Sequence, residues 1–239
     1  CRNVAPLVTA WTECTSPHTI ALSSPGVVTE HIFQVRAIDL TGNRAADGIA
    51  PSYVWNVGPA PVPKTVFCGQ TVTQSITVLN SLGDCLAHGL VIGANDITID
   101  LNGKTIDGKA LGAAILNNGH DNVTIKNGTL VEFDYGVQLT VGTKDNIVEN
   151  VTVHMNQDAA VGLGHATAPM DPTQVPSDPP PSGLSGVTGN IVRGSTLVSN
   201  TRGVWLTNGA KGSLVQGSLM GGSSSEAVFL DRALENRIE

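Results

Sequence analysis

Charged and aromatic side chains are scarce in this sequence of 239 residues: charged residues make up 14% of it and aromatic residues 4%. No run of apolar residues is long enough to cross a membrane as a helix, and a signal-peptide pattern is either absent or has been trimmed. A basic excess is missing too, because the formal net charge is −7. This balance argues against a nucleic-acid binder, and it would repel an anionic polysaccharide unless a cation bridged the two.

The four cysteines lack the close Cys-x-x-Cys spacing that is typical of zinc sites. They fall instead into two local pairs, Cys1 with Cys14 and Cys68 with Cys85. This proximity predicts two structural disulfides and therefore an oxidising, exported setting. Four unpaired buried thiols are the alternative.

Glycine is abundant, with 27 residues, and short stretches alternate in polarity. In DNVTIKNGTLVEFDYGVQL, residues 121–139, apolar Val123 and Ile125 alternate with polar neighbours, which is the period of a strand with one buried face. Asn127-Gly128 then predicts a turn, since both residue types tolerate positive φ. A single stretch of this kind fits an ordinary hairpin, so the fold depends on whether the pattern recurs.

The pattern does recur along the chain. Strand starts follow one another in steps of 24, 44, 23 and 23 residues, and their anchors are Asn122, Asn146, Asn190, Ser213 and Asn236. A second series has steps of 24, 24, 43 and 24 residues, and its members are Gly112, Gly136, Ala160, Gly203 and Ala227. The long step in each series contains a Pro-rich insertion near residues 166–185. Two independent anchors with the same period indicate an internal repeat.

A repeat of 23–24 residues is too short for paired helices, and the leucine-rich-repeat signature is missing. The sequence therefore predicts an all-β parallel solenoid, with coils stacked at the strand spacing of about 4.8 Å. Two inward ladders of apolar side chains are expected: Val137, Val161, Val204 and Val228 in one, and Leu139, Leu163, Leu206 and Leu230 in the other. Inward-facing Asn side chains are expected to satisfy turn backbone groups from coil to coil.

The same region carries a resemblance to a known family, through CGQTVTQSITVLNSLGDC at 68–85, GLVIGANDITIDLNGKTIDG at 89–108 and the coils that follow. These segments resemble the right-handed parallel β-helix proteins of the pectin-lyase-like superfamily. The resemblance implies a right-handed β-helix over residues 67–239, an N-terminal cap bridged by Cys68 and Cys85, and further coils after Glu239. It is specific for fold rather than chemistry, because the superfamily includes lyases, hydrolases, epimerases and binding proteins.

Residues 1–57 have a different texture. Trp11, CTSP at 14–17, HIFQVRAIDLTGN at 31–43 and YVWNV at 53–57 look like the immunoglobulin-like or fibronectin-III-like modules of large exported bacterial proteins. The likeness implies a β-sandwich, and since a complete module needs about 100 residues, a partial one is expected. The prolines of GPAPVPK predict an extended linker over residues 58–66.

Aligning the coils places Asp134 one coil from Asp158, so the two carboxylates are expected about 5 Å apart. That separation suits a shared Ca²⁺ or the acid and nucleophile of a retaining glycosidase. Lyases of the resembled superfamily use an arginine as base beside calcium-binding acids, and Arg202 lies one coil from Asp158. Two solvated turn aspartates and a surface pair of Arg202 with Glu226 are the alternatives. Calcium is the one cofactor that these residues suggest.

The ligand-binding candidates are Tyr135, Trp205, Phe229 and His165. Trp205 projects outward if its neighbours in the chain face inward, and it stacks over Phe229 of the next coil as a platform for a sugar ring. The alternative is that the insertion or a partner covers both rings. His165 flanks the same region, and neither His-x-His nor His-x-x-x-His spacing supports a metal site there. The insertion at 166–185 either walls a groove beside these residues or forms a surface loop.

These observations favour an exported or cell-surface, multi-domain protein whose β-helix binds or scaffolds polysaccharide, with the N-terminal module as a spacer. The expected partner is a polysaccharide or cell-surface glycan, without nucleic acid and without membrane insertion in this segment. The alternative is a polysaccharide lyase or glycoside hydrolase that acts through Asp134, Asp158 and Arg202. A periplasmic metal-handling β-helix lacks support, because Met and His clusters are missing.

Overall fold

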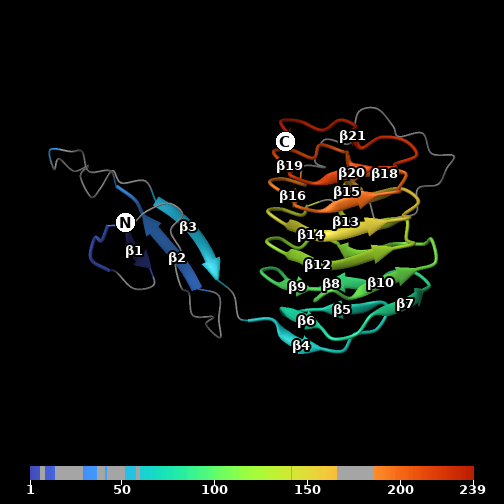
Figure 1. Cartoon of the computed structure of the whole chain (residues 1–239), viewed down its shortest axis with the longest axis horizontal. Helices are drawn as coiled ribbons and strands as arrows, with labels where there is room; N and C mark the ends of the chain where they lie inside the picture. Colours follow the sequence, from blue (N-terminus) through green and yellow to red (C-terminus); the bar gives the residue numbers. More distant parts are fainter. Residues whose placement is uncertain are drawn as a thin grey trace. The chain divides into compact units, whose positions relative to one another are not determined.

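The structure is a computed structural model that describes residues 1–5, 9–13, 29–36, 41, 52–57, 60–140, 142–165 and 186–239. The chain divides into two compact units, Cys1–Ala60 and Pro61–Glu239. Every regular element in the described ranges is a β-strand (Figure 1). Among these residues there is consequently no helix of the length and hydropathy needed to span a membrane.

The first unit contains an antiparallel sheet of three strands in the order β1-β2-β3. These strands are β1 (Arg2–Ala5), β2 (Thr29–Gln34) and β3 (Ser52–Val57). The guanidinium groups of Arg2 and Arg36 lie over the Trp11 ring, at 4.7 Å and 4.0 Å from its centroid. The strands fit the predicted all-β character of this unit, whereas its likeness to an immunoglobulin-like module stays a prediction.

Several predictions for the first unit fall outside the described residues. These include the CTSP segment at 14–17 and positions 37–40, 42 and 43 of the predicted strand and turn. Cys14 belongs to this group, so its pairing with Cys1 also stays a prediction.

The second unit is a parallel β-solenoid of about 6 turns, as the repeat predicted. Its coils build two long parallel sheets, one of twelve strands and one of seven (Figure 1). The seven-stranded sheet consists of β5 (Gln70–Val72), β8 (Leu90–Ile92), β11 (Ala113–Asn117), β13 (Tyr135–Thr140), β15 (Ala159–His165), β18 (Arg202–Leu206) and β21 (Val228–Leu230).

The twelve-stranded sheet consists of β4 (Val62–Lys64), β6 (Ile76–Val78), β7 (Leu82–Cys85), β9 (Thr98–Asp100), β10 (Thr105–Gly108), β12 (Thr124–Val131), β14 (Ile147–His154), β16 (Ile191–Arg193), β17 (Thr196–Val198), β19 (Leu214–Gln216), β20 (Leu219–Gly221) and β22 (Arg237–Ile238). The first of these, β4, pairs with β6. Residues 62–64 of the predicted linker are therefore part of the solenoid.

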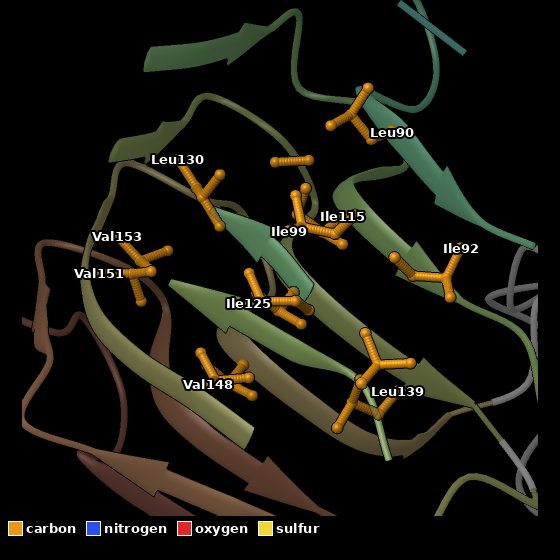
Figure 2. Packing of buried hydrophobic residues seen from close by; sticks show 14 of the residues in the cluster. Leu90, Ile92, Ile99, Ile115, Ile125, Leu130, Leu139, Val148, Val151 and Val153 are labelled. Atoms are coloured by element: carbon orange, nitrogen blue, oxygen red, sulfur yellow. The ribbon is translucent and has the colours of Figure 1, made fainter. Parts of the chain in front are cut away.

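The core is the space that the two sheets enclose, and it is filled by apolar side chains from every coil. Figure 2 shows Leu90, Ile99, Ile115 and Ile125 among the side chains that meet there. The register of the two predicted ladders is confirmed, because Val137 pairs with Val161 and Leu139 with Leu163, and the pairing continues into β18 and β21. The ladder members in β13, β15 and β18 are fully buried, whereas Leu230 of β21 is 50% exposed. Burial of such a side chain contributes about 1.5–3 kcal/mol, so the stability of the solenoid accumulates coil by coil.

The Asn127-Gly128 turn is a corner inside a strand rather than a hairpin. Strand β12 runs through it, and its two halves pair with β14 in one continuous parallel register. Asn127 has φ 61°, and the equivalent Asn150 of β14 has φ 51°. Asparagine tolerates this left-handed conformation, which lets each coil bend while its ladder continues.

One member of the glycine series was aligned wrongly. Ala113 pairs with Tyr135 and Ile115 with Val137, so Ala114 and not Gly112 lies beside Gly136. Gly112 has φ 71° at the preceding corner, where a Cβ would meet the carbonyl oxygen of Ala87 at 2.6 Å. The corner therefore requires glycine at position 112. This shared residue type led to its wrong alignment with Gly136.

The first asparagine anchor was misplaced by one residue. Thr124 pairs with Ile147, so Val123 and not Asn122 occupies the position of Asn146. Asn122 has φ 55° and its Nδ2 donates to Asp96 Oδ1 at 2.7 Å on the outside of the coil. The remaining anchors, Asn146, Asn190, Ser213 and Asn236, do align in neighbouring coils.

Two buried asparagine ladders run between coils, as predicted. In the first, Asn146 Oδ1 accepts a hydrogen bond from Val123 N at 2.8 Å, and Asn146 Nδ2 donates to Asn190 Oδ1 at 2.9 Å. In the second, Phe133 N donates to Asn156 Oδ1 at 3.0 Å, and Asn156 Nδ2 donates to Asn200 Oδ1 at 2.9 Å. These side chains satisfy backbone groups that the corners leave unpaired in the interior.

The first coil is closed by the disulfide between Cys68 and Cys85, whose Cα atoms are 5.5 Å apart. This confirms the second of the two predicted pairs and excludes the alternative that these cysteines are free thiols. The bond joins the turn before β5 to the last residue of β7.

Candidate functional site

Asp134 and Asp158 lie at the amino ends of neighbouring strands of the seven-stranded sheet, β13 and β15. Tyr135 pairs with Ala159, and Asp158 N donates to Asp134 O at 2.9 Å. The next strand, β18, begins with Arg202, which pairs with Ala159. The coil alignment that predicted this column of residues is therefore right.

The two carboxylates have different surroundings. Asp134 Oδ2 accepts a hydrogen bond from Gly112 N at 2.8 Å. Burial, and then the charge of Asp134, raise the pKa of Asp158, while a hydrogen bond from Tyr135 and the charge of Arg202 act in the opposite sense. Asp158 therefore holds a proton more readily than an ordinary aspartate.

Tyr135 supports Asp158 rather than presenting its ring to solvent. Its side chain is 8% exposed and packs with Ala113, Leu116 and Ala159 on the outer side of the sheet. Burial, and then the charge of Asp158, raise the pKa of the Tyr135 hydroxyl above its usual range. The hydroxyl therefore stays protonated and can donate to the carboxylate. Tyr135 was predicted as a ligand-binding residue only from its position in the column of aligned coil residues.

His88 joins this site, and the sequence reasoning missed it. Its Nδ1 accepts a hydrogen bond from Ala113 N at 3.1 Å, which requires Nδ1 to be free of a proton. Burial lowers the pKa of His88, against opposing effects from the Ala113 backbone and the charge of Asp134. Continuing the coil alignment backwards from Ala113 would have brought His88 into view.

Arg202 is paired with Glu226, as the alternative interpretation of the sequence stated. Arg202 Nε lies 3.1 Å from Glu226 Oε2. A hydrogen bond from Ser225 to the same carboxylate, at 2.5 Å, and the charge of Arg202 lower the pKa of Glu226. A guanidinium that is ion-paired in this way is a poor base, because it does not lose its proton in proteins.

Trp205 and Phe229 form an aromatic pair across neighbouring coils. They are paired in register, with ring centroids 5.9 Å apart and an interplanar angle of 61°. Val204 and Leu206 are fully buried, so Trp205 points to the outer side of the sheet as predicted. The Arg202 guanidinium lies 4.3 Å from the Trp205 ring centroid and 5.0 Å from that of Phe229.

The described residues do not place the other predicted site elements in this cluster. His165 is the last residue of β15, but its side chain lies outside the described residues. The same is true of the insertion at 166–185, so its role as a groove wall stays a prediction. Within the described ranges, no group of three or more His, Cys, Asp or Glu side chains could hold a metal ion. Ca²⁺ prefers six to eight oxygen ligands, and Asp134 with Asp158 supplies few of them.

No family model, curated protein or solved structure matches this chain. The class of the second unit therefore rests on its own geometry. It is a parallel β-solenoid with two carboxylates at the amino ends of β13 and β15, and with an ion pair and an aromatic pair between the coils of β18 and β21.

Proposed function

We propose that this chain belongs to an exported or cell-surface protein whose β-solenoid binds a polysaccharide on the outer side of β15, β18 and β21. The observation that carries the proposal is the Trp205–Phe229 pair, held in register on the outer side of the sheet. The faces of aromatic rings are apolar and flat, and they suit the C–H faces of sugar rings. The disulfide of the first coil supports an oxidising compartment.

The geometry supports a neutral polysaccharide better than an acidic one. Arg202 is the cation beside the rings, and its charge is already matched by Glu226. Asp134 and Asp158 add negative charge next to it, and the whole chain carries a net charge of −7. A uronic-acid chain would be repelled at this site. The hydroxyl groups of a neutral sugar could accept hydrogen bonds from the terminal nitrogens of Arg202.

A glycoside hydrolase is the second candidate, and the raised pKa of Asp158 beside Asp134 favours it. Two carboxyl groups with different environments can divide the work of acid and nucleophile. In that scheme Asp158 donates a proton to the leaving oxygen, and Asp134, held by Gly112 N, is the nucleophile. A lyase reaction has less support, because Arg202 would have to act as base while paired with Glu226.

The first test is a binding measurement with the whole 239-residue chain. Isothermal titration with neutral and uronic oligosaccharides is expected to give binding to a neutral member of the panel. Trp205→Ala and Phe229→Ala are each expected to weaken it at least about tenfold, or 1.4 kcal/mol. Phe67→Ala is the matched control, because Phe67 is an exposed aromatic on the first coil. Equal affinity in the parent and Trp205→Ala would contradict the proposed site.

The two candidate functions are separated by product analysis on the same panel. New reducing ends that disappear in Asp158→Ala would establish hydrolysis, and absorbance of unsaturated sugars would establish a lyase. Binding without new ends leaves the polysaccharide-binding function as the better description.

A further inference from the structure

An open groove lies on the other sheet of the solenoid. It has a volume of about 500 Å³ and crosses three successive coils, at the ends of β16 and β19 and at the corner inside β14. Its lining residues are Glu149, Asn150, Arg193, Gly194, Gln216 and Gly217. Glu149 pairs with Arg193 and Arg193 with Gln216, so the groove follows the stacking direction of the coils.

The groove exists because a ladder of polar side chains stops. Asn127 Nδ2 donates to Asp100 Oδ1 at 3.1 Å, and Asn150 Nδ2 donates to Asn127 Oδ1 at 2.7 Å. In the next two coils the same corner is occupied by Gly194 and Gly217, with φ of 56° and 55°. A Cβ built on either glycine would have no atom within 4 Å. Space for two more polar side chains is therefore open at the end of the ladder.

The lining offers hydrogen-bond donors and acceptors without a net charge. Arg193 binds Glu149 Oε2 through Nε at 2.8 Å and through Nη2 at 2.6 Å, so the two charges cancel. Gln216 Nε2 donates to Glu239 Oε2 of the next coil at 3.1 Å. Asn150 Oδ1 accepts no hydrogen bond from another described residue, and Gly194 occupies the corresponding position in the next coil.

We propose that this groove binds a sugar unit of a neutral glycan, at a site separate from the Trp205–Phe229 pair. Each sugar hydroxyl donates one hydrogen bond and accepts others, so one hydroxyl can receive from Arg193 or Gln216 and donate to Asn150 Oδ1. The charges of Glu149 and Arg193 match each other, so the lining has no uncompensated charge to attract an ionic ligand.

Filling the groove gives a test that leaves the fold intact. Gly194→Asn introduces at this corner the residue type that Asn127 and Asn150 supply in the two preceding coils. Gly194 has the same left-handed backbone conformation as these two asparagines. The added side chain is expected to continue the ladder and to occupy the ligand position. Gly212→Asn is the matched control, because Gly212 has φ 62° and open space around its Cβ but lies at a different corner.

The whole chain is titrated with neutral cello-, xylo-, manno- and N-acetylated chito-hexaose, and amide signals are followed by NMR. One of these sugars is expected to shift the Gly194 and Gly217 signals of the parent. The Gly217 shift is expected to persist in Gly212→Asn and to vanish in Gly194→Asn, which no longer has a Gly194 signal. Trp205→Ala should leave the sugar-induced shifts of Gly194 and Gly217 unchanged, which separates this site from the Trp205–Phe229 pair. The proposal is overturned if none of the four sugars shifts these signals, or if Gly194→Asn still responds. Loss of the shifts in Trp205→Ala would also overturn the separate site.

Discussion

Asn146 Nδ2 donates to Asn190 Oδ1 at 2.9 Å although 44 residues separate them in the chain. Asn146 N donates to the same oxygen at 2.9 Å. The Pro-rich insertion lies between the two asparagines, yet their coils stack like the others, with Ile147 paired to Ile191. The coils before and after the insertion are therefore in register with each other.

The buried asparagines are expected to be major contributors to stability. Asn190→Ala removes the acceptor of two buried donors, which costs about 1–3 kcal/mol for each group left unsatisfied. We expect a lower free energy of unfolding by at least that amount in urea, followed by far-ultraviolet circular dichroism. Gln157→Ala, at an exposed position, is the control and should change the value by less than about 0.5 kcal/mol. A similar effect of both variants would mean that the ladder is dispensable.

A glycine of the inner face should tolerate no methyl group. A Cβ on Gly136 would lie 2.6 Å from Ala160 O and against the Val153 side chain. Gly136→Ala is therefore expected to cost about 1–3 kcal/mol or more, because the core cannot expand to admit it. Gly83→Ala has open space and no positive φ, so it should be neutral or stabilise by up to about 1 kcal/mol. Equal urea midpoints for the two variants would refute this reading of the core.

The repeat could be predicted because each inward position must hold an apolar or amide side chain in every coil. That constraint placed Val137 over Val161 and Asp134 beside Asp158 correctly. It failed at Gly112 and Asn122, whose identities are set by positive φ at corners instead of by the inner ladder. Residue type alone does not distinguish these two demands on glycine and asparagine.

The chemistry of the site was less accessible from the sequence. The outward position of Trp205 followed from alternation, and the pairing of Arg202 with Glu226 followed from the coil period. The burial of Tyr135 did not, because it depends on packing outside the sheet, where no period applies. His88 escaped notice for a related reason: it lies in the loop before β8, where the coil alignment had not been extended.

The disulfide of the first coil should stabilise the solenoid. Cys68 and Cys85 are 17 residues apart, and a closed loop of about this size restricts the unfolded chain by roughly 3 kcal/mol. The double variant Cys68→Ala with Cys85→Ala is expected to unfold at a lower temperature by calorimetry. Phe67→Ala, which changes an exposed neighbour, should not shift the transition comparably. An unchanged transition in the double variant would show that the other coils hold the first one closed.

Asp158 should make the solenoid less stable as the pH rises. Because burial and the charge of Asp134 raise its pKa above the ordinary value of 3.8, the folded chain binds this proton more tightly than the unfolded chain does. The stability that this proton contributes is fully present below pH 3.8 and is lost as the pH rises through the raised pKa of the folded state. Asp158→Asn cannot ionise, so its urea midpoint should rise relative to the parent over that window. Asp84→Asn makes the same substitution at an exposed carboxylate and is the control.

A second variant separates the two causes of the raised pKa of Asp158. Asp134→Asn removes the neighbouring charge but leaves Asp158 half-buried, so the pKa of Asp158 should fall toward its ordinary value without reaching it. Tyr135→Phe removes a hydrogen bond that favours the carboxylate, so the same pKa should rise. Both shifts can be followed by carbon NMR of the Asp158 carboxyl. If Asp134→Asn left this pKa unchanged, burial and not the neighbouring charge would raise it, and the two carboxylates would not be electrostatically coupled.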